Sequence, residues 1–223
     1  MMNSLTRKLV VCSFLVCTAG AAIAKPPQSE FLEQTESLAP VPGVEGAYGW
    51  DNPKLPVSDY DKLFIDHVQI FLAPDSPYKG FDSSQMQAIS QTFRAVMIAT
   101  LEPEYPVVSQ TGPGVMRLSL AITNLSITKK RKGLVNYTPV GLVVGGLRSL
   151  ADEFSNISLG AATVEADITD SSSGERIAAR IATKPFAQAG VGEGQMSWKS
   201  LESAFGFYAS EVRRTLDAAH GKK

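Results

Sequence analysis

The sequence predicts an α+β fold: a single domain in which a mainly antiparallel sheet of about four to five strands is packed by two long helices. Several short runs alternate apolar and polar residues, which is typical of strands. Two longer runs, over residues 82–101 and 198–219, repeat apolar residues every three or four positions, as helices with one buried face do. The order is strand, helix, strands, hairpin and helix, which indicates one layer of helices on a sheet.

Residues 1–24 have the three parts of a secretory signal peptide. Two basic residues precede an apolar run over residues 9–16, and small residues follow, ending in Ala22-Ile23-Ala24. The apolar run is too short for a membrane span. We therefore expect cleavage between Ala24 and Lys25 and export to the periplasm, with a retained N-terminal anchor as the alternative.

Both cysteines, Cys12 and Cys17, lie in the segment that cleavage would remove. Valine precedes each of them, whereas bacterial lipoprotein signals have a small residue before the cysteine, so a lipid anchor is not expected. A mature chain of residues 25–223 would have no thiol. We therefore expect no disulfide-linked partner, no thiol nucleophile and no zinc–thiolate site.

Residues 25–60 predict a proline-rich extended arm. Regular helix or a central strand is unfavourable where prolines are this frequent. Tyr48 and Trp50 are expected to dock the arm onto the domain surface, with contact to a partner as the alternative. Six of the chain's 13 prolines lie here: Pro26, Pro27, Pro40, Pro42, Pro53 and Pro56.

The α+β domain is expected over residues 61–220, beginning with a strand at residues 62–72. An N-cap at Asp82, Ser83 or Ser84 begins a helix that Pro103 ends. A short strand at residues 106–109 and a longer one from residue 115 to about 127 follow. In the longer strand, apolar residues alternate with mostly polar ones, so one face is predicted to be buried.

A hairpin and a helix complete the domain. Strands at about residues 158–169 and 175–184 flank Asp170-Ser-Ser-Ser-Gly174, which has the composition of a turn. The final helix is marked by apolar residues at helical spacing: Trp198, Leu201, Phe205, Tyr208, Val212, Leu216 and Ala219.

The ionisable residues predict no catalytic, cofactor or metal site. His67 and His220 lack the spacing of metal ligands, and a structural role is expected for His67, with an acid–base pair with Asp66 as the alternative. The sequence has no nucleophile elbow, P-loop or dinucleotide-binding fingerprint. A carboxylate-based enzyme would need a pocket that holds several of five residues: Asp61, Asp66, Asp152, Asp167 and Asp170.

A basic cluster, Lys129, Lys130, Arg131 and Lys132, precedes an apolar run over residues 140–147 that includes Leu142, Val143 and Val144. Such a segment is able to contact anionic lipid head groups or a protein partner. The alternative is a charged strand end that leads into a buried crossover. The apolar run is too short to span a bilayer.

Short turn and strand motifs give the chain a family resemblance. Over about residues 45–218 it resembles the bacterial envelope family known as domain of unknown function 3313. The resemblance implies an envelope location and brings no known activity or site residues. Many relatives look like lipoproteins, and this chain departs from them at the cysteine. The motifs are Asp59-Tyr-Asp61, Phe64-Ile-Asp66 with Val68, Gly112-Pro-Gly-Val-Met-Arg-Leu118, Ala121-Ile-Thr123, the Pro139-Val-Gly-Leu segment and Asp170 to Ala178.

The near-neutral charge argues against nucleic acid as a partner. The 223 residues carry 21 Lys and Arg against 22 Asp and Glu, whereas nucleic-acid binders normally show a strong basic excess. We therefore expect an exported, non-catalytic binding or accessory component of the cell envelope whose partner is an envelope protein or the membrane surface. The alternative is a carboxylate-based hydrolase or a small-ligand or lipid-binding protein with a pocket between sheet and helices.

Overall fold

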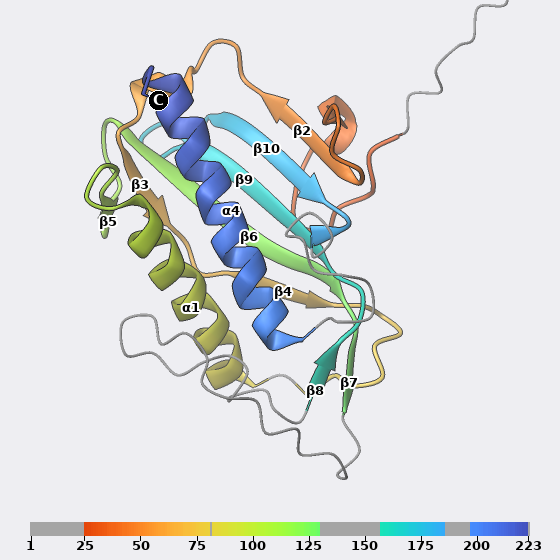
Figure 1. Ribbon diagram of the computed structural model, residues 1–223. Helices are drawn as coiled ribbons and strands as arrows, with labels where there is room; N and C mark the ends of the chain where they lie inside the picture. Colours follow the sequence, from red (N-terminus) through yellow and green to blue (C-terminus); the bar gives the residue numbers. More distant parts are fainter. Residues whose placement is uncertain (1–24, 81, 130–156, 186–196, 223) are drawn as a thin grey trace, which may run out of the picture.

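The computed structural model describes residues 25–80, 82–129, 157–185 and 197–222. Within them, two long helices lie side by side on one face of an eight-stranded mixed sheet (Figure 1), which confirms the α+β class. The helices are α1 (Ser83–Leu101) and α4 (Trp198–Ala219). The sheet contains β1 (Ala39–Pro40), β2 (Ala47–Asp51), β3 (Lys62–Ile65), β4 (Gln69–Leu72), β5 (Val107–Val108), β6 (Val115–Leu125), β9 (Thr163–Asp170) and β10 (Arg176–Ala182). A separate ribbon pairs β7 (Ile127–Lys129) with β8 (Ile157–Leu159).

The sheet is larger than predicted, and it is mixed where a mainly antiparallel sheet was expected. Its strand order is β1-β2-β10-β9-β6-β3-β5, and β4 also pairs with β6. The strands β3 and β4 run parallel to β6, whereas β9, β10 and β2 are antiparallel to their neighbours. Parallel neighbours need a long crossover, and α1 with β5 supplies it. This helix was predicted from the sequence, but its role as the connection between parallel strands was not.

Part of the segment predicted as an extended arm belongs to the sheet. All five residues of β2 pair antiparallel with β10, and β1 pairs with β2 at the edge. Proline is tolerated in an edge strand such as β1 because no ladder hydrogen bond is lost on the outer side. The ordered sheet therefore begins before Asp61.

The predicted strand over residues 62–72 is interrupted. The backbone N–H of Val68 donates to the buried Ser90 Oγ of α1 at 2.9 Å, instead of continuing the strand ladder. The strands on either side keep their pairing with β6 but shift register by one residue. The interruption ties the sheet to α1 at this point.

Both helices begin with capping boxes. At the start of α1, the Gln85 N–H donates to Asp82 Oδ1 at 2.9 Å and the Asp82 N–H donates to Gln85 Oε1 at 3.2 Å. This confirms one of the three predicted N-caps. At the start of α4, Ser197 and Ser200 make the reciprocal pair.

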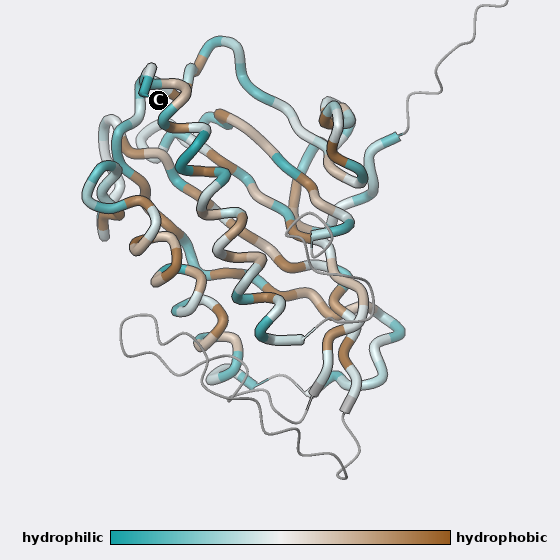
Figure 2. The backbone as a smooth tube through the Cα atoms, in the orientation of Figure 1, coloured by the Kyte–Doolittle hydropathy of each residue, from teal (hydrophilic) through white to brown (hydrophobic). Residues whose placement is uncertain are grey.

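The helices meet through an edge-to-face contact of Phe93 and Phe205, with ring centroids 5.1 Å apart. The hydropathy of the helices and central strands alternates along the chain (Figure 2), as expected for elements with one buried face.

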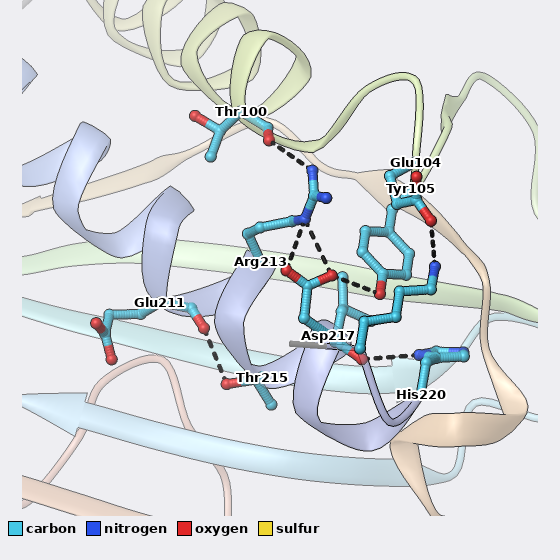
Figure 3. Close-up of polar contacts among 10 residues, drawn as sticks. Thr100, Glu104, Tyr105, Glu211, Arg213, Thr215, Asp217 and His220 are labelled. Carbon is cyan, nitrogen blue, oxygen red and sulfur yellow. Dashed lines mark hydrogen bonds and ion pairs between the residues drawn. The ribbon is translucent and has the colours of Figure 1, made fainter.

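The C-terminal end of α4 is fastened to the end of α1 and the loop that follows (Figure 3). Tyr105 Oη donates to Asp217 Oδ1 at 2.9 Å, and Arg213 Nε donates to the same carboxylate at 2.9 Å. Lys222 pairs with Glu104 and lies 4.6 Å from the centroid of the Tyr105 ring. This network fixes the position of α4 above the sheet.

Candidate functional site

An apolar cavity of about 290 Å³ lies between α4 and the outer strands of the sheet. Figure 1 shows α4 crossing β6 and β9, whereas β10 and β2 extend beyond it. Side chains of β6, β9 and β10 that face the helices form the floor of this cavity, which we call the α4 groove.

Small side chains on β9 and β10 create the space. Ala166, Ala178 and Ala182 lie on the side of the sheet that faces the helices. Because an alanine side chain ends at Cβ, these positions leave the interval between sheet and helix unfilled. The other floor residues are Met116, Leu118, Leu120, Val164 and Ile168.

The walls of the α4 groove are also apolar. One wall is α4, from Phe207 to Leu216, a stretch of about 14 Å at the rise of an α-helix. The opposite wall is the segment that contains Val41, Val44 and Ala47. Val44 is one of the large apolar side chains that remain exposed in the described part of the chain. The groove therefore has apolar side chains on both walls as well as on its floor.

Arg180 is the cationic group in the α4 groove. Its guanidinium donates to the Trp50 carbonyl at 2.7 Å, to the Ala179 carbonyl at 2.9 Å and to Asp51 Oδ1 at 2.5 Å. The stem of Arg180 lies flat over Gly49, where a Cβ would come within 3.1 Å of Arg180 Cδ. Glycine at this position lets the arginine lie along β2.

Tyr208 and Glu211 give α4 its polar atoms near the groove. Burial, with a smaller contribution from the charge of Glu211, raises the pKa of Tyr208 far above its usual value. The phenol therefore stays neutral, and its Oη lies 3.5 Å from the Pro185 carbonyl oxygen. Glu211 pairs with Arg214.

The carboxylates considered for catalysis do not meet in the α4 groove. Arg117 holds Asp66 in a two-pronged ion pair at 2.7 and 3.1 Å, and Arg176 holds Asp167 in the same way at 2.7 and 3.0 Å. Arg117 alternates with the floor residues of β6, and Asp167 alternates with those of β9, so both pairs lie on the opposite face of the sheet.

The remaining carboxylates from that set are also apart from the groove. Asp61 pairs with Lys62, and Asp170 accepts hydrogen bonds in the β9–β10 turn. Asp152 lies outside the described residues. The residues that the structure describes contain no group of three or more His, Cys, Asp or Glu placed to hold a metal ion.

Tyr48 and Trp50 lie on the sheet face away from the helices. There they pack against a small second core made by Leu32, Leu38, Ala179 and Ile181. Tyr48 also reaches the boundary of the α4 groove, because β2 forms its outer edge.

The other predicted contact residues fall largely outside the described part of the chain. Lys129 is the last residue of β7. Lys25 is exposed. Ala24, Lys130, Arg131, Lys132, Leu142, Val143 and Val144 lie outside the described residues.

Neither histidine takes part in the α4 groove. His67 is exposed between β3 and β4. His220 Nδ1 lies 2.8 Å from the Leu216 carbonyl oxygen at the end of α4 (Figure 3). Neither described helix is long and apolar enough to cross a bilayer.

Residues 27–212 match the model of a family described as a protein of unknown function (DUF3313). This chain belongs to the DUF3313 family. The match covers the sheet and most of α4, and it includes the residues that line the α4 groove except Thr215 and Leu216. No curated protein matches the chain.

Three solved structures are similar to this DUF3313 chain. A PelC dodecamer from Paraburkholderia phytofirmans has 13% identity and a TM-score of 0.34, covering 76% of this chain and 95% of the other. A neuraminyllactose-binding hemagglutinin homologue from Helicobacter pylori has 13% identity and a TM-score of 0.38, covering 74% and 87%. A DUF4136 protein from Bacteroides thetaiotaomicron has 11% identity and a TM-score of 0.34, covering 78% and 96%. These low scores carry no inference about function.

A pocket between sheet and helices was one of the alternatives predicted from the sequence, but the residues that shape the α4 groove were not predicted. A signal was present, because Ala166, Ala178 and Ala182 occupy floor positions in the predicted hairpin. Small residues where bulky ones are usual mark a place where the layer above is not filled. No local sequence pattern pointed to Arg180, because only the pairing of β2 with β10 places it beside Gly49 and Asp51.

Proposed function

We propose that this DUF3313 protein is a non-catalytic binding protein of the bacterial cell envelope, and that it holds the acyl chain of an envelope lipid in the α4 groove. The observation that supports this proposal is the apolar groove between α4 and the β6-β9-β10-β2 part of the sheet. Ligand sites are typically apolar clefts with a few polar groups at fixed positions, and Arg180 and Asp51 supply such groups here.

The apolar lining of the groove suits a hydrocarbon chain. Its helical wall runs for about 14 Å, which accommodates an extended hydrocarbon of moderate length. Each methylene group transferred from water into such a site contributes about 0.8 kcal/mol. Several methylenes would therefore provide useful affinity without a buried polar partner.

The proposal includes export and a membrane-facing role. The signal-peptide pattern of residues 1–24 supports a periplasmic location. The basic cluster at residues 129–132 would be drawn to anionic head groups. The second partner that we propose is an envelope protein that docks at residues 129–150.

Displacement of a fluorescent fatty acid tests the groove. Ala166→Leu adds bulk to the floor, and we expect it to weaken fatty-acid binding by about tenfold or more, since it removes the volume that several methylenes would fill. The matched control is Ala99→Leu, which adds the same atoms at an exposed position of α1. Binding is measured by titration, and folding of each variant is checked by circular dichroism.

Two results would contradict the proposal. One is the absence of saturable fatty-acid binding by the wild-type protein. The other is equal binding by wild type, Ala166→Leu and Ala99→Leu, which would place any bound fatty acid outside the groove. If Ala166→Leu fails to fold, Ala178→Leu tests the same floor from the neighbouring strand.

A further inference from the structure

A second cavity, of about 360 Å³, lies on the opposite face of the sheet from the α4 groove. It is enclosed between the N-terminal segment, residues 25–38, and the strands β6 and β9. Glu165 and Thr163 of β9 line it together with Thr123 and Asn124 of β6, and Gln28 and Glu30 close it from the N-terminal segment. We call it the Glu165 cavity.

Glu165 is unusual in the described part of the chain. Its residue is only 2% exposed, and it is the one buried Asp, Glu, Lys or Arg among the described residues. Its neighbour Asp167, two residues along β9, is paired with Arg176 on the same sheet face. Glu165 has no such cation within ion-pair distance among the described residues, although an ionised carboxylate is costly to bury without one.

Two hydroxyl groups are the hydrogen-bond donors to Glu165. Thr123 Oγ1 donates to Oε1 at 2.5 Å, and Ser29 Oγ donates to Oε2. These hydroxyls supply hydrogen bonds without positive charge, and each carboxylate oxygen retains a lone pair that can accept another donor. The site therefore contains a buried carboxyl group whose described side-chain partners are two neutral hydroxyls.

The lining of the Glu165 cavity indicates the chemistry of a ligand. Among the residues that the structure describes, it contains two acidic residues, Glu165 and Glu30, with threonine hydroxyls and an asparagine amide, and no Lys, Arg or His. A primary ammonium group carries a positive charge and three donors and has no acceptor, so it complements this set. A calcium ion usually needs more oxygen ligands, several of them carboxylates, and the described residues offer no group of three.

We propose that the Glu165 cavity binds a small organic molecule through a primary ammonium group that pairs with Glu165. The volume is several times that of one water molecule, so it accommodates the ammonium together with a short polar chain. This site is separate from the α4 groove and does not depend on the proposed lipid-binding function.

The N-terminal segment would respond to such a ligand. Leu32 and Leu38 bury this segment against the sheet, and the Glu33 carbonyl accepts from Arg176 Nη1 at 2.8 Å. Ser29 connects the segment to Glu165 directly. A bound ammonium group would bridge segment and sheet, so it is expected to slow proteolysis near Ser29.

Calorimetric titration of the full-length mature protein with ethanolamine tests the proposal. Ethylene glycol is the neutral probe of similar size, and Ca²⁺ is the metal probe. We expect saturable binding of ethanolamine alone. Glu165→Gln keeps the size and an acceptor oxygen but removes the charge, and it should weaken ethanolamine binding by at least about tenfold.

Glu33→Gln is the matched control, because it removes the same charge from an exposed position of the same segment outside the cavity. It should leave binding unchanged. Thr163→Val provides a second variant in the cavity if Glu165→Gln does not fold, and it should also weaken binding. A purely structural role of Glu165 predicts that its substitution changes the melting temperature while no ethanolamine binds to the wild type.

Three outcomes would overturn the proposal. These are no ethanolamine binding by wild type, equal binding by wild type and Glu165→Gln, and binding of Ca²⁺ in preference to ethanolamine. None of them bears on fatty-acid binding in the α4 groove, so the two sites are tested independently.

Discussion

Tyr60 and Asp170 join two distant parts of the chain by a hydrogen bond of 2.9 Å between the phenol and the carboxylate. Burial, together with the adjacent Asp170, raises the pKa of Tyr60 to about 12. Hydrogen bonds from the Ser173 and Ser172 backbone N–H groups and from Tyr60 hold the pKa of Asp170 below its ordinary value. A neutral phenol therefore donates to an ionised carboxylate only at pH values between the pKa of Asp170 and the pKa of Tyr60.

The pH dependence of stability follows from these two directions. The contribution of Tyr60 is full below its unfolded pKa of about 10 and is lost as pH rises toward 12. The contribution of Asp170 is full above its unfolded pKa of about 3.9 and is lost as pH falls through the lower folded value.

Tyr60→Phe tests this bond. We expect it to lower the free energy of unfolding by about 1–2 kcal/mol near pH 7, with the difference from wild type shrinking above pH 10 and in strong acid. The measurement is urea unfolding across pH. Curves for wild type and variant that stay parallel over the whole range would contradict the assignment of this bond to the pH dependence.

At the scale of the element, the capping of the first turn helps to determine where each helix begins, in addition to the packing of its apolar face. Asp82 accepts hydrogen bonds from the Gln85 N–H and the Ser84 hydroxyl, and these lower its pKa. The cap satisfies backbone N–H groups that have no partner within the helix. It also fixes the residue at which the crossover helix begins above the sheet.

Asp82→Ala should cost about 1 kcal/mol of stability, because the capping box is lost while the buried face of α1 is untouched. Gln87→Ala is the control: it changes an exposed residue of the same helix outside the cap and should change stability by no more than about 0.5 kcal/mol. Both are measured by urea unfolding. Equal effects of the two substitutions would show that the cap contributes nothing specific.

At the scale of the whole molecule, we expect export to remove the first 24 residues. The pattern of residues 1–24 predicts that the exported chain begins at Lys25. Intact-mass measurement of the protein from a periplasmic extract checks this, with Ala24→Leu as a variant that should block cleavage. A periplasmic species that retains Met1 would contradict it.

Local patterns in the sequence were enough to predict the two helices. Met86, Ile89, Phe93 and Met97 repeat at helical spacing, and the observed α1 ends at Leu101, shortly before the predicted stop at Pro103. The β9–β10 hairpin was predicted for the same reason, since its turn and both strands lie within about 20 residues. Such elements depend on neighbours in the chain.

The strand directions and the α4 groove depend on contacts between distant residues, and these were not predicted. Alternation is the same for a parallel and an antiparallel strand, so β3 gave no sign of running parallel to β6. In β2, Tyr48 and Trp50 alternate with Ala47, Gly49 and Asp51, but the surrounding prolines obscured that pattern. The groove appears only once β2 has its place beside β10.

That pairing also fixes an order of assembly. Asp51 pairs with Ala178 and Ala47 with Ala182. The N-terminal strand β2 is therefore expected to pair only after the β9–β10 hairpin, near the other end of the chain, has formed. Closing so long a loop is slow compared with forming the helices or the hairpin. The outer wall of the α4 groove would therefore form late in folding, and we expect a nascent or C-terminally shortened chain to lack the proposed lipid-binding activity.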